Sequence, residues 1–129
     1  MNIPEGLKYT KEHEWVSIED GVATIGITDH AQNELGEIVY VEIETVGEEI
    51  DKDEVFGTVE AVKTTSDLYM PISGKVIEFN DQLNEDEGDN PGLINEDPYG
   101  DGWIIKVQIT QTDELDELLN AGDYTNLIS

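Results

Sequence analysis

A single lysine, Lys63, stands between two runs of residues that are typical of β-strands. Valines recur before it at Val55, Val59 and Val62, and the apolar letters of SDLYMPI follow it. Two such runs can pair as a hairpin and leave AVKT as the bend. A lysine at such a bend presents its amine to water, where another enzyme could read and modify it. From geometry alone, a lysine that simply solubilises an exposed hairpin would look the same.

Length and composition favour one globular domain over 1–129. The chain is 37% hydrophobic and 29% charged, and a chain of 129 residues can bury a real core. It contains no cysteine, which excludes disulfides and thiolate metal sites. No apolar run approaches the roughly 20 residues of a spanning helix. The segment MNIPEGLKYTKEHEW lacks the pattern of a secretory or transit signal. We therefore expect a cytoplasmic protein with no membrane partner.

The balance of charge is strongly acidic. The chain has 31 acidic residues and 6 basic ones, which gives a formal net charge of -25. Such a charge repels polyphosphate, so nucleic acid and anionic membranes are poor partners. Protein partners with basic patches suit it better. Solubility, or growth in a salty medium, would explain the same charge without a dedicated docking face.

The first half of the chain predicts a hairpin followed by a short helix. In EWVSIEDGVATIGIT, two β-rich runs flank the dipeptide DG, which supplies the backbone angles of a tight turn, so we expect a hairpin over 15–28. The next segment, TDHAQNELGE, offers Thr28 or Asp29 as an N-cap and Gly36 as a C-cap. A short helix is therefore expected between these residues.

The remaining patterns predict further strands and one C-terminal helix. Strand-like runs occur in EIVYVEIE, GKVIEFN and GWIIKVQI. In TDELDELLNAG, Thr112 reads as a cap, acids fill the first turn and Gly122 reads as a stop, within a helical segment of about 112–128. Short strands linked mostly by hairpins, with helices at the margins, favour a mainly β fold, a small flattened β-barrel or sandwich.

The segment VEAVKTTSDLYMPISGKV resembles the lipoyl-lysine hairpin of the H-protein family of the glycine cleavage system. The likeness extends through KEHEWVSIEDGVATIGITDHAQNELGEIVYVE and PGLINEDPYGDGWIIKVQI, and it covers nearly the whole chain. The resemblance implies a fold of the lipoyl/biotinyl-domain type and a lipoyl group in amide linkage to Lys63. Glu60 and Gly74 match the positions by which lipoate-attaching enzymes recognise their target in the wider family.

The function that this resemblance implies is that of a carrier rather than an enzyme. The lipoyl arm would take the aminomethyl group of glycine from a pyridoxal-phosphate-dependent glycine decarboxylase and pass it to a folate-dependent aminomethyltransferase. A dihydrolipoamide dehydrogenase would then reoxidise the arm. A carrier that visits several enzymes in turn gains nothing from hiding its surface, so we expect a monomer.

Family resemblance also places the loaded arm in a surface cleft near the HEW segment. It nominates Glu14 and Asp67, with His30 nearby, since a protonated aminomethyl group prefers carboxylates around it. Plain surface charge would equally explain the two acids, and local hydrogen bonds at a helix start would explain His30. Metal binding is not expected, because no second histidine lies at ligand spacing from His13 and DNPGLINEDPYGDG does not match a calcium loop.

Three other interpretations compete with this one. A lipoate-relay protein would donate its lipoyl group to other acceptors. A biotinyl domain usually has methionines beside its lysine, whereas Val62 and Thr64 flank Lys63 here. An enzyme using Lys63 as a Schiff-base amine would need burial or nearby cations to depress its pKa.

The acidic loop NEDEGDN, at 84–90, is longer by about four residues than the corresponding loop of the family that the chain resembles.

Overall fold

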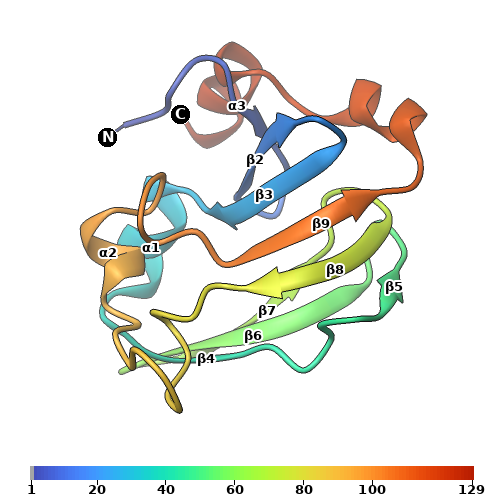
Figure 1. The fold of residues 1–129 in the computed structure, drawn as a ribbon. Helices are drawn as coiled ribbons and strands as arrows, with labels where there is room; N and C mark the ends of the chain where they lie inside the picture. The colour runs from blue at the N-terminus through green and yellow to red at the C-terminus, as the bar shows by residue number, and fades with distance from the viewer. Residues whose placement is uncertain (1) are drawn as a thin grey trace.

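Two antiparallel β-sheets pack face to face in the computed structural model, which describes residues 2–129 (Figure 1). One sheet has the order β1 (Lys8–Tyr9), β2 (Glu14–Glu19), β3 (Val22–Ile27), β9 (Ile105–Ile109), β8 (Gly74–Phe79), β5 (Glu49–Ile50). The other has the order β4 (Ile38–Glu42), β6 (Val55–Ala61), β7 (Thr65–Tyr69). The helices are α1 (Asp29–Leu35), α2 (Leu93–Glu96) and α3 (Ala121–Ile128), with a 3₁₀ helix, η1 (Thr112–Glu117). The mainly β sandwich with short helices is thus confirmed.

The predicted hairpin and the helix after it are both present. β2 and β3 pair antiparallel, and Asp20 and Gly21 join them with φ of 53° and 79°. These left-handed angles suit a two-residue turn that matches the twist of the strands. The Thr28 side chain accepts the Ala31 N–H as the N-cap of α1, and Gly36 ends the helix. Local backbone rules therefore fix how the chain enters and leaves α1.

The core lies between the two sheets, and a second apolar cluster closes one end. The main core combines inward residues of both sheets with side chains from a loop and from α2, including Ile25, Val59, Leu68, Val76, Leu83, Ile94 and Val107. The second cluster brings together Tyr9, Trp15 and Tyr124, with the rings of Tyr9 and Tyr124 stacked at 4.8 Å. It joins β1 to α3, whose sequence positions are far apart (Figure 1).

The C-terminal helical segment differs from the prediction of one helix from Thr112 to Gly122. Thr112 lies inside η1, and Gln111 precedes it as the N-cap. Gly122 does not stop a helix, since it lies in the first turn of α3. The break between the two helices has a long-range cause: Leu119 and Tyr9 exchange two backbone hydrogen bonds of 2.8 Å each, which requires extended backbone there. Asn120 then starts α3 by accepting the Asp123 N–H at 2.8 Å.

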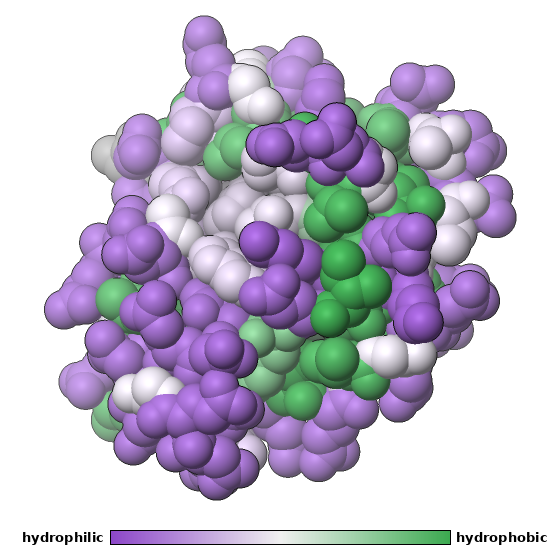
Figure 2. All heavy atoms as spheres, in the orientation of Figure 1, coloured by the Kyte–Doolittle hydropathy of each residue, from purple (hydrophilic) through white to green (hydrophobic). Residues whose placement is uncertain are grey.

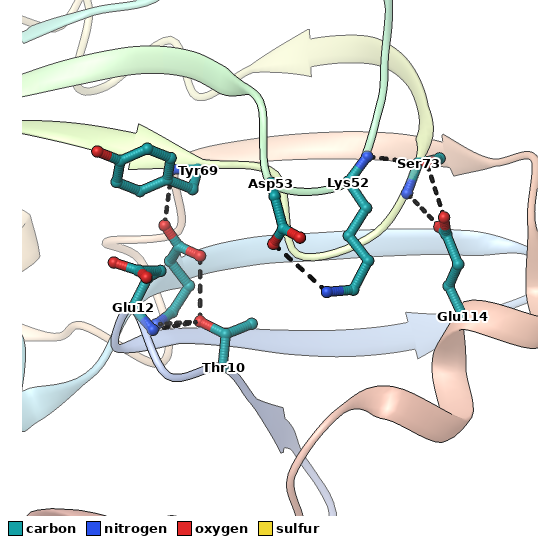
Figure 3. A network of polar contacts seen from close by, with 8 residues as sticks. Thr10, Glu12, Lys52, Asp53, Tyr69, Ser73 and Glu114 are labelled. Carbon is teal, nitrogen blue, oxygen red and sulfur yellow. Dashed lines mark hydrogen bonds and ion pairs between the residues drawn. The ribbon is translucent and has the colours of Figure 1, made fainter.

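η1 is tied to the sandwich by one carboxylate. Glu114 accepts the Ser73 backbone N–H at 2.7 Å and the Ser73 hydroxyl at 2.9 Å. The same hydroxyl oxygen accepts the Lys52 N–H at 2.8 Å, and Figure 3 shows this junction beside the Lys52–Asp53 pair. Glu114 therefore holds the β7–β8 connection, one residue before β8 begins.

Acidic and polar side chains cover most of the surface. Figure 2 shows a largely hydrophilic face with one band of hydrophobic side chains crossing it. The acidic loop between β8 and α2 folds into successive turns, in which the Asp86 and Asp89 N–H groups bond to Asn84. Among residues 2–129 no helix has the length and apolar character needed to cross a membrane.

Replacing Glu114 by alanine should lower the free energy of unfolding by about 1–3 kcal/mol, because the Ser73 N–H loses its acceptor. Urea denaturation followed by tryptophan fluorescence would measure the change. Asp116→Ala, an exposed position in the same 3₁₀ helix, is the matched control and should have little effect. Equal stabilities for the two variants would contradict a stabilising role for the hydrogen bonds between Ser73 and Glu114.

Candidate functional site

The β6–β7 hairpin ends in a tight bend that carries Lys63. Glu60 pairs with Thr65 in the last rung, and the Ala61 N–H donates to the Thr64 carbonyl at 2.7 Å across the bend. Lys63 is exposed, and the Val62 side chain before it is 72% exposed. AVKT is therefore the bend, as the sequence predicts, and the amine of Lys63 lies in solvent.

One backbone hydrogen bond fastens this bend to the rest of the protein. The Val62 N–H donates to the Glu37 carbonyl at 3.0 Å, between α1 and β4. The neighbouring Gly36 has a left-handed φ of 82°, and a Cβ placed there would lie 3.5 Å from Lys63 Cε. Glycine thus allows the backbone turn after α1, while the lysine stem passes at an ordinary contact distance.

Asn95 of α2 holds the segment that holds the bend. Its side-chain oxygen accepts the Ile38 N–H at 2.9 Å. Its side-chain nitrogen donates to the Gly36 carbonyl at 2.8 Å and to Gln32 Oε1 at 3.0 Å. Reasoning from the sequence missed this residue. The available signal was an amide side chain in a short helix, within the LINEDP motif, with no cap to make.

The amine of Lys63 has no ion pair among residues 2–129, where the ion pairs join Lys52 to Asp53 and His30 to Glu34. No group of three or more acidic or histidine side chains in this part of the chain is arranged to hold a metal ion. What the bend offers chemically is an accessible primary amine on a fixed backbone. Such a group can be acylated by another protein.

Glu60 and Gly74 lie in different settings. Glu60 is exposed on β6, three residues before the lysine. Gly74 is buried at the start of β8, and a Cβ there would collide with the Gln108 carbonyl and the Val107 side chain of β9. Gly74 is therefore needed for the close approach of two strands, whatever else recognises it.

A cavity of about 390 Å³ lies between α1, the turn at His13 and the hairpin. His30 and Asp67, two of the nominated residues, both line it. Glu12 and Glu34 add further carboxylates, and the apolar part of the wall consists of Ile27, Ala31, Leu35, Val59 and Leu68. This mixture suits an occupant with an apolar body and a positive end.

Glu14, the third nominated residue, faces a neighbouring cavity of about 280 Å³ instead. Its carboxylate accepts the Tyr69 N–H at 2.8 Å and the Thr10 hydroxyl at 3.2 Å, and the residue is only 2% exposed. Figure 3 shows Thr10, Glu12 and Tyr69 around this position. Glu12 lines both cavities.

Burial dominates the chemistry of Glu14. Loss of hydration raises its pKa to about 8, although the hydrogen bonds from Tyr69 and Thr10 act in the opposite direction. The nearby acids Glu12 and Asp53 raise the pKa further. A carboxyl group of this kind exchanges its proton near neutral pH, unlike an exposed glutamate.

The Glu14 pKa makes stability depend on pH. The unfolded carboxyl titrates near 4.5 and the folded one near 8, so between these values the unfolded state binds fewer protons. The contribution of Glu14 to the free energy of unfolding is therefore fully present below pH 4.5 and is lost as pH rises toward 8. Glu14→Gln, which does not titrate, should gain at least about 1.4 kcal/mol on the wild type between pH 5 and 8, the value of one pKa unit.

Urea denaturation across that pH range would measure this gain. Glu19→Gln, at the exposed end of β2, is the matched control and should track the wild type. Parallel curves for Glu14→Gln and the wild type would show that Glu14 titrates normally.

The support that Asn95 gives to the segment 36–38 can be tested at the Val62 amide. In Asn95→Ala the segment 36–38 loses its side-chain partners, so the Val62 amide should exchange with solvent about tenfold faster or more. Residue-resolved hydrogen exchange would measure it, corrected for global stability. Asn33→Ala, exposed on α1, is the control. Unchanged exchange of the Val62 amide in Asn95→Ala would refute this role of Asn95.

Comparison with known proteins agrees with the geometry. The model of the glycine cleavage H-protein family matches residues 7–129. The glycine cleavage system H protein of Bacteroides fragilis is 50% identical over 129 residues, covering 100% of this chain and 99% of the relative. That of Carboxydothermus hydrogenoformans is 52% identical over 126 residues, covering 98% and 94%.

A solved structure supports the same assignment. The crystal structure of a glycine cleavage system H protein from Mycobacterium marinum superposes with a TM-score of 0.81 at 37% identity, covering 96% of this chain and 97% of that one. The family resemblance inferred from the hairpin motif is confirmed. The chain belongs to the glycine cleavage H-protein family.

Proposed function

We propose that this lipoyl carrier of the glycine cleavage system holds its lipoyl group on Lys63, in amide linkage, and that residues 1–129 act as one carrier domain. The observation that carries this proposal is an exposed amine at the tip of the β6–β7 hairpin in a chain of the H-protein family. The protein would have no catalytic residues of its own. Its task would be to present, shelter and release the arm.

The hairpin fits such a modification. Lys63 is exposed, its stem passes Gly36 at an ordinary contact distance, and amide formation removes its charge. When bound, the lipoyl group supplies a disulfide that accepts two electrons with an aminomethyl unit and later leaves as a dithiol, chemistry that this cysteine-free chain lacks. The hydrogen bond from Val62 fixes the direction in which the arm starts.

A lipoate-attaching enzyme would read the hairpin through features on both sides of the lysine. Glu60 is exposed on β6 and can contact that enzyme directly. Gly74 is buried, so its contribution is to bring β8 close to β9 and thereby shape the surface beside the hairpin. In this proposal Glu60 is a contact and Gly74 a structural requirement.

The cavity beside the hairpin would shelter the loaded arm. Its apolar wall suits a hydrocarbon chain, while Asp67 and Glu12 suit a protonated amine, with His30 at the rim of α1. Glu14, in the adjacent cavity, stays a predicted second acceptor for the same cation. Sheltering keeps the aminomethyl group from water until a partner displaces the arm.

The partners in this proposal are glycine decarboxylase (P protein), aminomethyltransferase (T protein), dihydrolipoamide dehydrogenase (L protein) and a lipoate-attaching enzyme. The net charge of -25 favours basic patches on their surfaces. A cytoplasmic monomer suits visits to several enzymes in turn. Gel filtration that gave a stable dimer would contradict the monomer.

Lys63→Arg should abolish the lipoyl adduct, because a guanidinium cannot take the place of the amine in the acyl transfer. Intact-mass measurement on protein purified from its native host would show the adduct in the wild type and its loss in the variant. Lys75→Arg, an exposed lysine on β8, is the matched control and should keep the adduct. A wild-type protein without an adduct on Lys63 would overturn the proposal, and a biotin mass would do so in favour of a carboxylase domain.

A lipoate relay is the second candidate, and the same adduct would not distinguish it. Deleting the gene separates the two roles: a carrier of glycine cleavage alone would leave other lipoylated proteins modified, while a relay would leave them without lipoate. We expect loss of glycine oxidation with normal lipoylation elsewhere.

A further inference from the structure

The hydroxyl group of Tyr124, in α3, contacts His13, a residue of the cavity wall. Its ring is fully buried and stacks on Tyr9, and its hydroxyl lies 2.7 Å from Thr28 Oγ1 and 2.9 Å from His13 Nδ1. Thr28 is the N-cap of α1 and His13 lines the cavity. One hydroxyl group therefore joins the C-terminal helix to two elements that frame the cavity.

The direction of each hydrogen bond between Thr28, Tyr124 and His13 follows from which groups must donate. Thr28 Oγ1 already accepts the Ala31 N–H at 3.2 Å, so its own hydrogen needs an acceptor, and Tyr124 Oη is the one at bonding distance within residues 2–129. The Tyr124 hydroxyl, having accepted from Thr28, donates to His13 Nδ1. The opposite order would leave the hydrogen of a fully buried Thr28 hydroxyl without a partner, which is unfavourable.

This order fixes the state of His13. Because Nδ1 accepts, the neutral ring carries its hydrogen on Nε2. The backbone assists: His13 has a left-handed φ of 68°, its N–H donates to the Thr10 carbonyl at 3.1 Å and its carbonyl accepts the Thr28 N–H at 3.0 Å. A non-glycine residue keeps such a φ only where its surroundings hold it.

We infer that Tyr124 is a positioning residue for the cavity beside the hairpin: the hydrogen-bond chain from Thr28 through Tyr124 to His13 holds the His13 ring neutral, with its Nε2–H in the cavity wall. The inference rests on the proposed function in taking that cavity as the shelter of the arm. A neutral ring leaves the carboxylates of the wall free to attract a cationic aminomethyl group. A protonated ring would repel it.

The charges around His13 act in both directions. Glu12 lies on its own turn, His30 and Glu34 face it from α1, and Asp67 lines the same cavity from β7. Burial lowers the pKa of His13 most, followed by His30, whose ring centre is 4.8 Å away, while Glu12 and Glu34 raise it. The net direction is downward, in agreement with a ring held neutral.

Tyr124→Phe tests the chain in the full-length protein, because phenylalanine keeps the ring on Tyr9 and removes only the hydroxyl. Long-range ¹H–¹⁵N NMR of the unmodified protein reports the tautomer of His13. We expect the Nε2–H form in the wild type and a mixture of tautomers in Tyr124→Phe, with a higher titration midpoint. Tyr40→Phe, on β4, is the control and should leave His13 unchanged.

The wild-type spectrum alone decides the order of hydrogens: a His13 protonated on Nδ1 would overturn the inference, whether or not the variant is stable. In aminomethyl-loaded protein, Tyr124→Phe should release the aminomethyl unit several-fold faster than the wild type at pH 6, and Tyr40→Phe should not. Equal release rates would refute the positioning role. If Lys63 accepts no lipoyl group, the proposed function fails, and the tautomer measurement still decides the hydrogen-bond chain.

Discussion

The hydrogen bond between the Val62 N–H and the Glu37 carbonyl, 3.0 Å long, is the contact on which the presentation of Lys63 depends. A hairpin tip that projects beyond its sheet has few neighbours and would otherwise fray. Here the tip is anchored to the segment after α1, and Asn95 in turn anchors that segment to α2. The amine thus combines full access with a fixed starting point, which a carrier of the H-protein family needs if partners are to find its arm.

Features governed by neighbouring residues could be predicted from the sequence. The dipeptide Asp20-Gly21 supplies left-handed angles, and Thr28 and Gly36 cap α1 by contacts within a few positions. The bend around Lys63 follows from two strands that pair across a short connection. In each case the physical cause lies within a few residues along the chain, so the local sequence is enough to predict the turn or cap.

Features set by distant partners could not be predicted. Gly122 looks like a helix stop, but Leu119 pairs with Tyr9 more than a hundred positions earlier in the chain, so the helix breaks sooner and restarts. Glu14 is followed by Trp15 and Val16, and all three are buried because β2 is covered on both faces at that end. Alternation therefore gave no sign that this carboxylate faces a different cavity from Asp67.

His13 and Tyr124 lie 111 residues apart in the chain. The side-chain hydrogen bonds that support the bend come from Asn95, whereas the His13 side of the cavity receives its hydrogen bond from Tyr124 near the end of the chain. Fraying of α3 would therefore disturb the wall of the cavity while the hydrogen bonds of the bend stay in place.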